Sequence, residues 1–128
     1  MTNEQFNKVF DTLVSQMRNT LTTKGTEYIR GNDKLHNFKR AAQIDDIHPL
    51  EALRGMSLKH RTSLSDIAKD ITKHDKLPTR ELLLEKTIDN LNYAVLEYAL
   101  ILEQIETSGI LEYSPNGKVH KVRHKTRN

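Results

Sequence analysis

Hydrophobic residues recur at three- and four-residue steps through three long segments of the chain, which is the pattern of helices with one buried face. We predict helices over about Asn3–Thr22, His48–Thr72 and Glu81–Glu106. In the first, the expected buried stripe is Phe6, Val9, Phe10, Leu13, Met17 and Leu21. In the last, the longest, it is Leu84, Ile88, Leu91, Val95, Tyr98, Leu102 and Ile105. Glycine follows the first and last segments closely, as expected where a helix stops.

The remaining pattern completes an all-α fold. A short helix over about Lys34–Gln43 would turn Leu35, Phe38 and Ala42 inward. The connection HDKLPTR between the last two long helices is short, which makes those helices antiparallel neighbours. Since each helix must bury its apolar stripe against another, we predict a helical bundle of three long helices plus a short helix, forming one domain over residues 1–109.

Residues 110–128 have a different character. Short apolar stretches flank the turn signal Pro115-Asn116-Gly117, so this segment forms either a small hairpin or an arm that docks on another subunit. From Ser108 onward there are five Lys or Arg residues against the single acid Glu112, so the net charge of +3 belongs to this basic tail rather than to the helical domain. Such a tail could bind nucleic acid or a protein, or simply aid solubility.

The composition excludes several classes of protein. There is no Cys among the 128 residues, so neither a disulfide framework nor a thiolate metal site can form. No apolar run approaches the length of a membrane span, and the N-terminus lacks the charged and apolar regions of a signal peptide. We therefore expect a cytoplasmic protein without a membrane partner.

Acidic residues on the last two long helices are the first candidates for chemistry. Glu85 and Asp89 are four residues apart and Asn92 is three further on, so the three line one ridge beside the apolar stripe. Two carboxylates at the rim of a core are hard oxygen donors suited to Mg²⁺ or Mn²⁺. Asp66 would face them across the antiparallel pair. A solvated helix surface is the simpler interpretation of this spacing alone. His60 lies in an apolar seam, where histidine is more often a core residue than a ligand.

The order of the motifs KGTEY, DKLHNFK, EALRGMSLKHRTSLSDI and EKTIDNLNY resembles a known family. The chain is similar to the MazG-like all-α nucleoside triphosphate pyrophosphohydrolases, in particular to phage-borne relatives with a nucleotide-modification-associated domain. The resemblance spans about Lys24 to Leu100. It implies a phage protein that forms a homodimer or higher oligomer and, with Mg²⁺ or Mn²⁺, converts an NTP or dNTP into a nucleoside monophosphate and pyrophosphate.

The resemblance also implies roles for individual residues. The metal ligands would be Glu85, Asp89 and Asp66, with Glu27, Asp33 and His60 as additional candidates. The attacking water would be oriented by one of these carboxylates or by His36. The phosphates would be contacted by Lys34, Lys39 and Lys59, and the base or ribose would be held by Tyr28, Asn92 and Tyr93.

Two other functions stay open. The family's metal signature has two adjacent Glu residues on the earlier helix, whereas this chain has Lys59-His60 and then Asp66 there. That departure favours a nucleotide-binding protein without catalysis. The basic tail and the exposed polar helix faces instead favour a phage factor that binds a host protein or nucleic acid.

Overall fold

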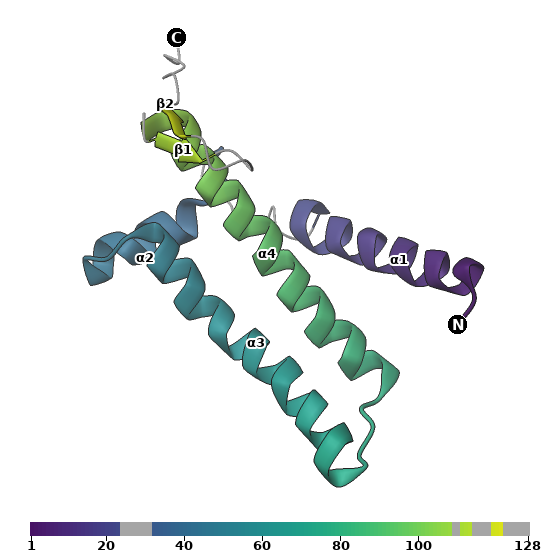
Figure 1. The fold of residues 1–128 in the computed structure, drawn as a ribbon. Coiled ribbons are helices and arrows are strands. Elements are labelled where there is room, and N and C mark those ends of the chain that lie inside the picture. The colour runs from purple at the N-terminus through teal and green to yellow at the C-terminus, as the bar shows by residue number, and fades with distance from the viewer. Residues whose placement is uncertain (24–31, 109–110, 114–118, 122–128) are drawn as a thin grey trace.

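The computed structural model describes residues 1–23, 32–108, 111–113 and 119–121. Its elements are α1 (Asn3–Arg18), a π-helical turn η1 (Asn19–Thr23), α2 (His36–Asp45), α3 (Pro49–His74), α4 (Arg80–Ser108), β1 (Leu111–Tyr113) and β2 (Val119–Lys121) (Figure 1). The all-α class and a bundle of four helices are therefore confirmed. The two strands pair antiparallel, with Leu111 opposite Lys121.

Polar side chains set the starts of the long helices. At α1, the Thr2 hydroxyl accepts from the Gln5 backbone N–H at 3.1 Å while the Gln5 side chain accepts from the Thr2 backbone N–H at 2.8 Å, a capping box. At α3, the imidazole Nδ1 of His48 accepts from the Leu50 backbone N–H at 3.0 Å. At α4, the Thr79 hydroxyl accepts from the Leu82 backbone N–H at 3.1 Å.

Helices α3 and α4 form an antiparallel pair, as the short connection predicts (Figure 1). Helix α3 is capped at its C-terminal end by Asp75, which is left-handed at φ 52° and whose backbone N–H donates to the carbonyl of Asp70. Helix α2 lies across one end of the pair and packs on α3. This arrangement places a buried core cluster of Leu35, Phe38, Leu53 and Leu100 where the three helices meet.

The face of α4 that meets α3 is not the apolar stripe that we expected to be buried. Asn90, Tyr93 and Glu97 make the contacts across to α3. Of the seven stripe residues only Ile88 is buried, and Val95, Tyr98 and Leu102 are exposed. The expectation of a fully buried stripe was therefore wrong, because α3 packs on a neighbouring face of the same helix.

The buried stripe expected on α1 was also wrong, although the helix itself was predicted correctly. None of the α1 residues, all of which the structure describes, is buried. The reason is that α1 approaches α4 only near the end that continues into η1 and then extends away from the rest of the molecule (Figure 1). Phe6 and Phe10 consequently face solvent in the single chain.

Candidate functional site

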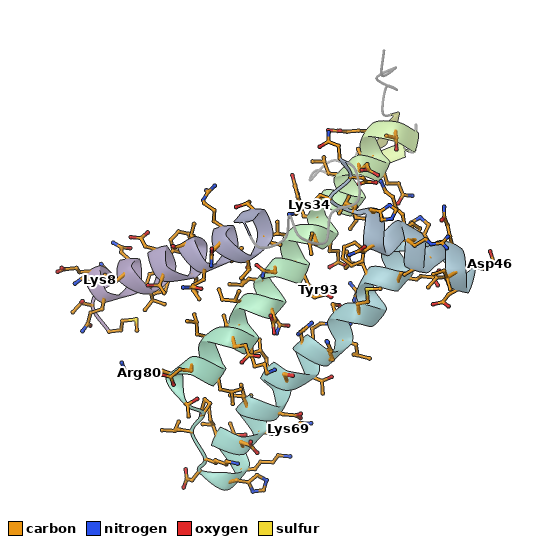
Figure 2. All side chains as sticks on the ribbon, turned by 180° about the vertical axis from the view of Figure 1, so that it is seen from behind. Lys8, Lys34, Asp46, Lys69, Arg80 and Tyr93 are labelled. Atoms are coloured by element: carbon orange, nitrogen blue, oxygen red, sulfur yellow. The ribbon has the colours of Figure 1, made fainter. Side chains whose placement is uncertain are left out.

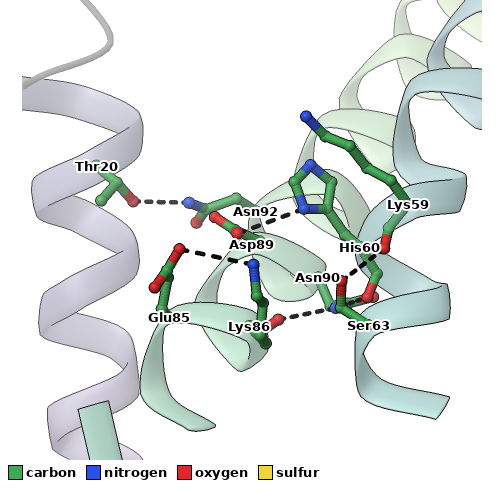
Figure 3. A network of polar contacts seen from close by, with 9 residues as sticks. All are labelled: Thr20, Lys59, His60, Ser63, Glu85, Lys86, Asp89, Asn90 and Asn92. Atoms are coloured by element: carbon green, nitrogen blue, oxygen red, sulfur yellow. Dashed lines mark hydrogen bonds and ion pairs between the residues drawn. The ribbon is translucent and has the colours of Figure 1, made fainter. Parts of the chain in front are cut away.

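A network of polar contacts connects α3, α4 and η1 at the middle of the long helices (Figure 3). Its centre is a contact between the carboxylate Oδ2 of Asp89 on α4 and the imidazole Nδ1 of His60 on α3, at 3.4 Å. The next residue, Asn90, donates from Nδ2 to the backbone carbonyl of His60 at 2.7 Å and to that of Lys86 at 2.8 Å. Both the backbone and the ring of His60 are thus tied to one turn of α4.

Aromatic contacts support the same histidine from another side. The rings of His60 and Tyr93 are 4.9 Å apart between centroids and tilted by 32°, and Phe38 meets Tyr93 edge-on at 6.3 Å. Burial raises the pKa of Tyr93 above its ordinary value of 10.0, and the negative charge of Asp89 raises it further. The phenol therefore stays protonated at neutral pH and keeps its proton to donate.

Two further predicted site residues lie on the same stretch of α4. Glu85 is one turn before Asp89 and is exposed, with one carboxylate oxygen 3.7 Å from the ammonium of Lys86. Asn92 donates from Nδ2 to the hydroxyl of Thr20 in η1 at 2.7 Å. Figure 3 shows Glu85, Asp89 and Asn92 together, with Thr20 on one side and His60 on the other.

One polar atom of this network has an unused hydrogen-bonding capacity. The side-chain Oδ1 of Asn92 is buried and has no hydrogen-bond partner among the residues that the structure describes. A buried acceptor without a donor costs about 1–3 kcal/mol, so such an atom is commonly satisfied by a ligand or an ordered water. This oxygen can therefore accept a hydrogen bond from a bound molecule.

The predicted metal ligands are only partly brought together. Across residues 1–23, 32–108 and the two strands, no group of three His, Asp or Glu side chains is arranged to hold a metal ion. Asp66 is exposed on α3, six residues beyond His60, and its role as third ligand stays a prediction. Glu85 and Asp89 alone still fit Mg²⁺ that arrives with a polyphosphate, because this ion commonly uses one or two carboxylates together with substrate phosphates and water.

The predicted phosphate-binding lysines separate into two places. The ammonium of Lys39 pairs with Asp33 at 2.7 Å and with Glu103 at 2.6 Å, and that of Lys34 donates to the carbonyl of Leu21. Both border a cavity of about 670 Å³ between η1 and the C-terminal half of α4. Only Lys59 lies beside the carboxylate network, exposed on α3 next to His60 (Figure 3).

The ion pairs of Lys39 shift the pKa values of Lys39 and Asp33. Its hydrogen bond to Asp33 lowers the pKa of that carboxyl below its ordinary value of 3.8. The hydrogen bonds to Asp33 and Glu103 raise the pKa of Lys39 above its ordinary value of 10.5. Because Glu103 is on α4 and Lys39 on α2, this cluster holds the short helix against the long one.

Other predictions are not brought to the network. His36 begins α2, and no contact between it and Glu85 or Asp89 is seen in the described part of the chain. Glu27 and Tyr28 lie outside the described residues. Sequence reasoning gave His60 only a secondary role and did not name Thr20 or Asn90. The apolar seam that contains His60 was the available signal for its partly buried position.

No protein-family model, curated protein or solved structure matches this chain. None of the described helices is long and apolar enough to cross a membrane.

Proposed function

We propose that the protein is a metal-dependent nucleoside triphosphate pyrophosphohydrolase, which converts an NTP or dNTP into the monophosphate and pyrophosphate. The observation that carries the proposal is the pairing of Asp89 with His60. It leaves the other oxygen of Asp89 for a ligand, one turn from the exposed carboxylate of Glu85. The resemblance of the motifs to the MazG-like family supports the same reaction.

The proposed reaction needs charge neutralisation and an aimed water molecule. A bound Mg²⁺ or Mn²⁺ neutralises the triphosphate and the departing pyrophosphate. Glu85 and Asp89 would hold the ion, with Asp66 as the predicted third ligand. A carboxylate of this pair would accept the proton of the water as its oxygen bonds to phosphorus and the P–O bond between the α- and β-phosphates breaks.

Nearby side chains provide contacts for the rest of the nucleotide. Lys59 is exposed next to His60 and has no ion-pair partner among the described residues, so its ammonium can contact a phosphate oxygen. The buried Oδ1 of Asn92 can accept from a base or ribose donor, and the protonated Tyr93 can donate. Lys34 and Lys39 border the cavity next to this site, where an extended substrate would pass along α4.

The setting of the reaction rests on the resemblance. A phage origin would place the protein in the host cytoplasm and favour a modified or deoxynucleotide as substrate. The family also supports a homodimer or higher homo-oligomer as the working form.

A product screen tests the proposal. Purified protein with Mg²⁺ or Mn²⁺ is incubated with each ribo- and deoxyribonucleoside triphosphate, and monophosphate and pyrophosphate are resolved by chromatography. We expect product from at least one nucleotide, and we expect Asp89→Asn to abolish it. Asp45→Asn, an exposed position on α2 away from the network, is the matched control and should retain full activity. No product from any nucleotide at high protein concentration would refute the reaction.

A nucleotide-binding protein without turnover is the second candidate. It is favoured by the finding that no three His, Asp or Glu side chains of the described residues are grouped to hold a metal ion. The same screen distinguishes this candidate from the enzyme. A nucleotide that stays tightly bound for hours without yielding product indicates binding without catalysis. The third candidate is a phage factor that binds a host protein or nucleic acid. It is tested by removing residues 114–128. If the shortened protein no longer captures that partner while its nucleotide chemistry is unchanged, the tail is the binding segment.

A further inference from the structure

A second hollow lies between α3 and α4, apart from the carboxylate network. It has a volume of about 150 Å³, and we call it the arginine groove. It is lined by Arg54, Ser57 and Arg61 of α3 and by Asn90, Tyr93 and Glu97 of α4. The lysines that the sequence analysis proposed for phosphate contact do not line it.

The arginine groove and the carboxylate network lie on different sides of α4. Asn90 and Glu97 are seven residues apart and share the side that contacts α3. Asp89 precedes Asn90 directly, and successive residues of a helix are about 100° apart, so Asp89 begins another ridge. That ridge continues to Asn92, which bonds to η1. Tyr93 lies between the two long helices (Figure 2), so a ligand in the groove would leave the carboxylates uncovered.

The side chain of Arg61 is folded back along α3 to the arginine groove. Its Nη2 donates to the backbone carbonyl of Arg54, about two turns earlier, at 3.4 Å. The same carbonyl accepts from the hydroxyl of Ser57 at 2.9 Å, and Ser57 is buried. The guanidinium of Arg61 is thus held at the groove rather than directed away from it.

Most of the hydrogen-bond donors in the arginine groove are unused. A guanidinium has five N–H donors. Arg54 uses Nη1 for Glu97 at 2.7 Å, Arg61 uses Nη2 for the carbonyl, and neither makes a further hydrogen bond among the residues that the structure describes. Asn90, by contrast, already donates from Nδ2 to two carbonyls. The donors available to a ligand are therefore those of the two arginines.

The arginine groove carries a net positive charge. Two guanidinium groups face the single carboxylate of Glu97. The side chains of Arg54 and Glu97 are 54% and 29% exposed, so the ion pair between them is held only weakly. Arg61 has no carboxylate partner in the described part of the chain. An anion with more charge than a carboxylate can therefore compete for Arg54 and neutralise Arg61.

We propose that the arginine groove binds a phosphate dianion, either inorganic phosphate or the terminal phosphate of a small molecule. A terminal phosphate carries about −1.5 to −2 charges at pH 7, and its oxygens match the paired N–H groups of a guanidinium. Pockets for drug-sized ligands measure about 300–1,000 Å³, so this groove takes the phosphate alone and leaves the rest of a larger ligand outside. The proposal does not depend on the proposed hydrolysis, and it involves no metal ion.

Titration with inorganic phosphate tests the proposal. Two-dimensional ¹⁵N NMR spectra are recorded at neutral pH with EDTA, and sodium chloride keeps the ionic strength constant. We expect saturable shifts of backbone amide signals from residues 54–61 and 90–97. Arg61→Gln should weaken binding by about tenfold or more, because it removes charged donors. Arg40→Gln is the matched control, since it removes an arginine from an exposed position on α2, and it should bind as the unmodified protein does.

A variant of opposite sign keeps the test valid if Arg61→Gln does not fold, which circular dichroism checks. Glu97→Gln removes the carboxylate that competes with phosphate, so it should bind more tightly. Absence of saturable shifts overturns the proposal. Equal affinities of the Arg61→Gln and Arg40→Gln proteins, or no gain in Glu97→Gln, also overturn it.

Two further arms locate the anion and identify its source. Lys59→Gln changes the cation next to the carboxylate network and should leave phosphate binding intact. Loss of binding in Lys59→Gln but not in Arg61→Gln would place the anion at that network and overturn the proposal. Glycerol 3-phosphate should bind as phosphate does if the groove accepts terminal phosphates. Tighter binding of a single-stranded oligonucleotide without terminal phosphates, lost in Arg61→Gln, would indicate a phosphodiester and overturn the proposed ligand class.

Discussion

His60 and Asp89 lie on different long helices, 29 residues apart in the sequence, with the imidazole Nδ1 3.4 Å from the carboxylate Oδ2. The backbone carbonyl of the same histidine accepts from Asn90 at 2.7 Å. A carboxylate that must bind a cation loses less freedom on binding when a neighbour already holds one of its oxygens. His60 is therefore positioned to orient Asp89 rather than to contact the substrate itself.

The first prediction concerns His60→Gln. Loss of the partner that orients a metal-binding carboxylate commonly costs about 10–100-fold in metal affinity or activity, and we expect a decrease of that size here. The fold should persist, because the bond from Asn90 is made to the backbone of residue 60. Calorimetric titration with Mg²⁺ and a non-hydrolysable nucleotide measures the affinity, and the product screen measures the rate.

His74→Gln is the control for this prediction. His74 is exposed at the end of the same helix, so its substitution removes a histidine without touching the network. If the two glutamine variants bind and turn over nucleotide equally well, His60 does not position Asp89.

The second prediction concerns the core. Leu53 on α3 is 1% exposed and packs with Leu35, Phe38 and Leu100. Truncation of a buried leucine removes transfer free energy and leaves a cavity, so Leu53→Ala should lower the free energy of unfolding by about 2–5 kcal/mol. Leu58→Ala on the same helix, at a residue that is 56% exposed, should change it by about 0.5 kcal/mol or less. Urea denaturation of both variants measures the difference, and equal losses would contradict the assignment of the core.

The helices were predictable from the sequence because local periodicity determines them. The antiparallel pairing of α3 and α4 was also predictable, since the connection between them is too short for another arrangement. Which faces meet was not predictable. Helix α4 has apolar residues on two sides, and its longest stripe is not the side that packs on α3. Only the tertiary arrangement shows which of these two sides of α4 packs on α3.

The same limit applies to the site. The ridge of Glu85, Asp89 and Asn92 follows from spacing within one helix, whereas the partners of these residues depend on the register between helices. That register is simple in retrospect. Leu53 on α3 and Leu100 on α4 belong to the same core cluster. Seven residues later on α3 is His60, seven residues earlier on α4 is Tyr93, and the rings of these two residues are in contact. One known contact would have placed His60 beside this ridge.

The ion pairs of Lys39 could not be predicted from the composition of its motif. Its place in a polar motif favoured a phosphate contact, but its ammonium lies between two carboxylates at 2.6 and 2.7 Å. Asp33 is six residues before it and Glu103 is on another helix, so neither partner follows from helical spacing. A phosphate contact of Lys39 stays a prediction, and it would compete with these ion pairs.

The third prediction concerns the titration of Tyr93. Burial and the charge of Asp89 raise its pKa above 10.0, so the folded state favours the neutral phenol. The contribution of Tyr93 to the stability of the fold is complete at a pH below its pKa in the unfolded chain. It is lost as the pH rises through its pKa in the folded state. Ultraviolet absorbance of tyrosinate should show a late-titrating group that is absent in Tyr93→Phe. In Asp89→Asn that group should titrate earlier, and an unchanged titration would mean that Asp89 does not act on the phenol.

The last prediction uses the cluster of Asp33, Lys39 and Glu103. The pKa of Asp33 lies below 3.8 in the folded state, chiefly because Lys39 donates to it, so the folded state binds fewer protons there than the unfolded chain does. The ion pair stabilises the fold fully at a pH above the pKa of Asp33 in the unfolded chain. This stabilisation is lost as the pH falls through the pKa of Asp33 in the folded state. Asp33→Asn keeps the side-chain oxygen that accepts from the Leu35 backbone N–H, and it replaces the oxygen that accepts from Lys39 with an amide nitrogen, so the charge and the hydrogen bond to Lys39 are lost together. The variant therefore isolates the ion pair.

Because both partners are about one-third exposed, the ion pair should contribute only about 0.2–1 kcal/mol at neutral pH. We expect urea denaturation to show Asp33→Asn less stable than the unmodified protein by that amount at pH 7, with the difference shrinking to zero in acid as Asp33 itself becomes protonated. Asp45→Asn removes one acidic charge from the other end of α2 and controls for net charge. A deficit of Asp33→Asn that persisted unchanged in acid would show that the loss comes from the backbone contact rather than from Lys39.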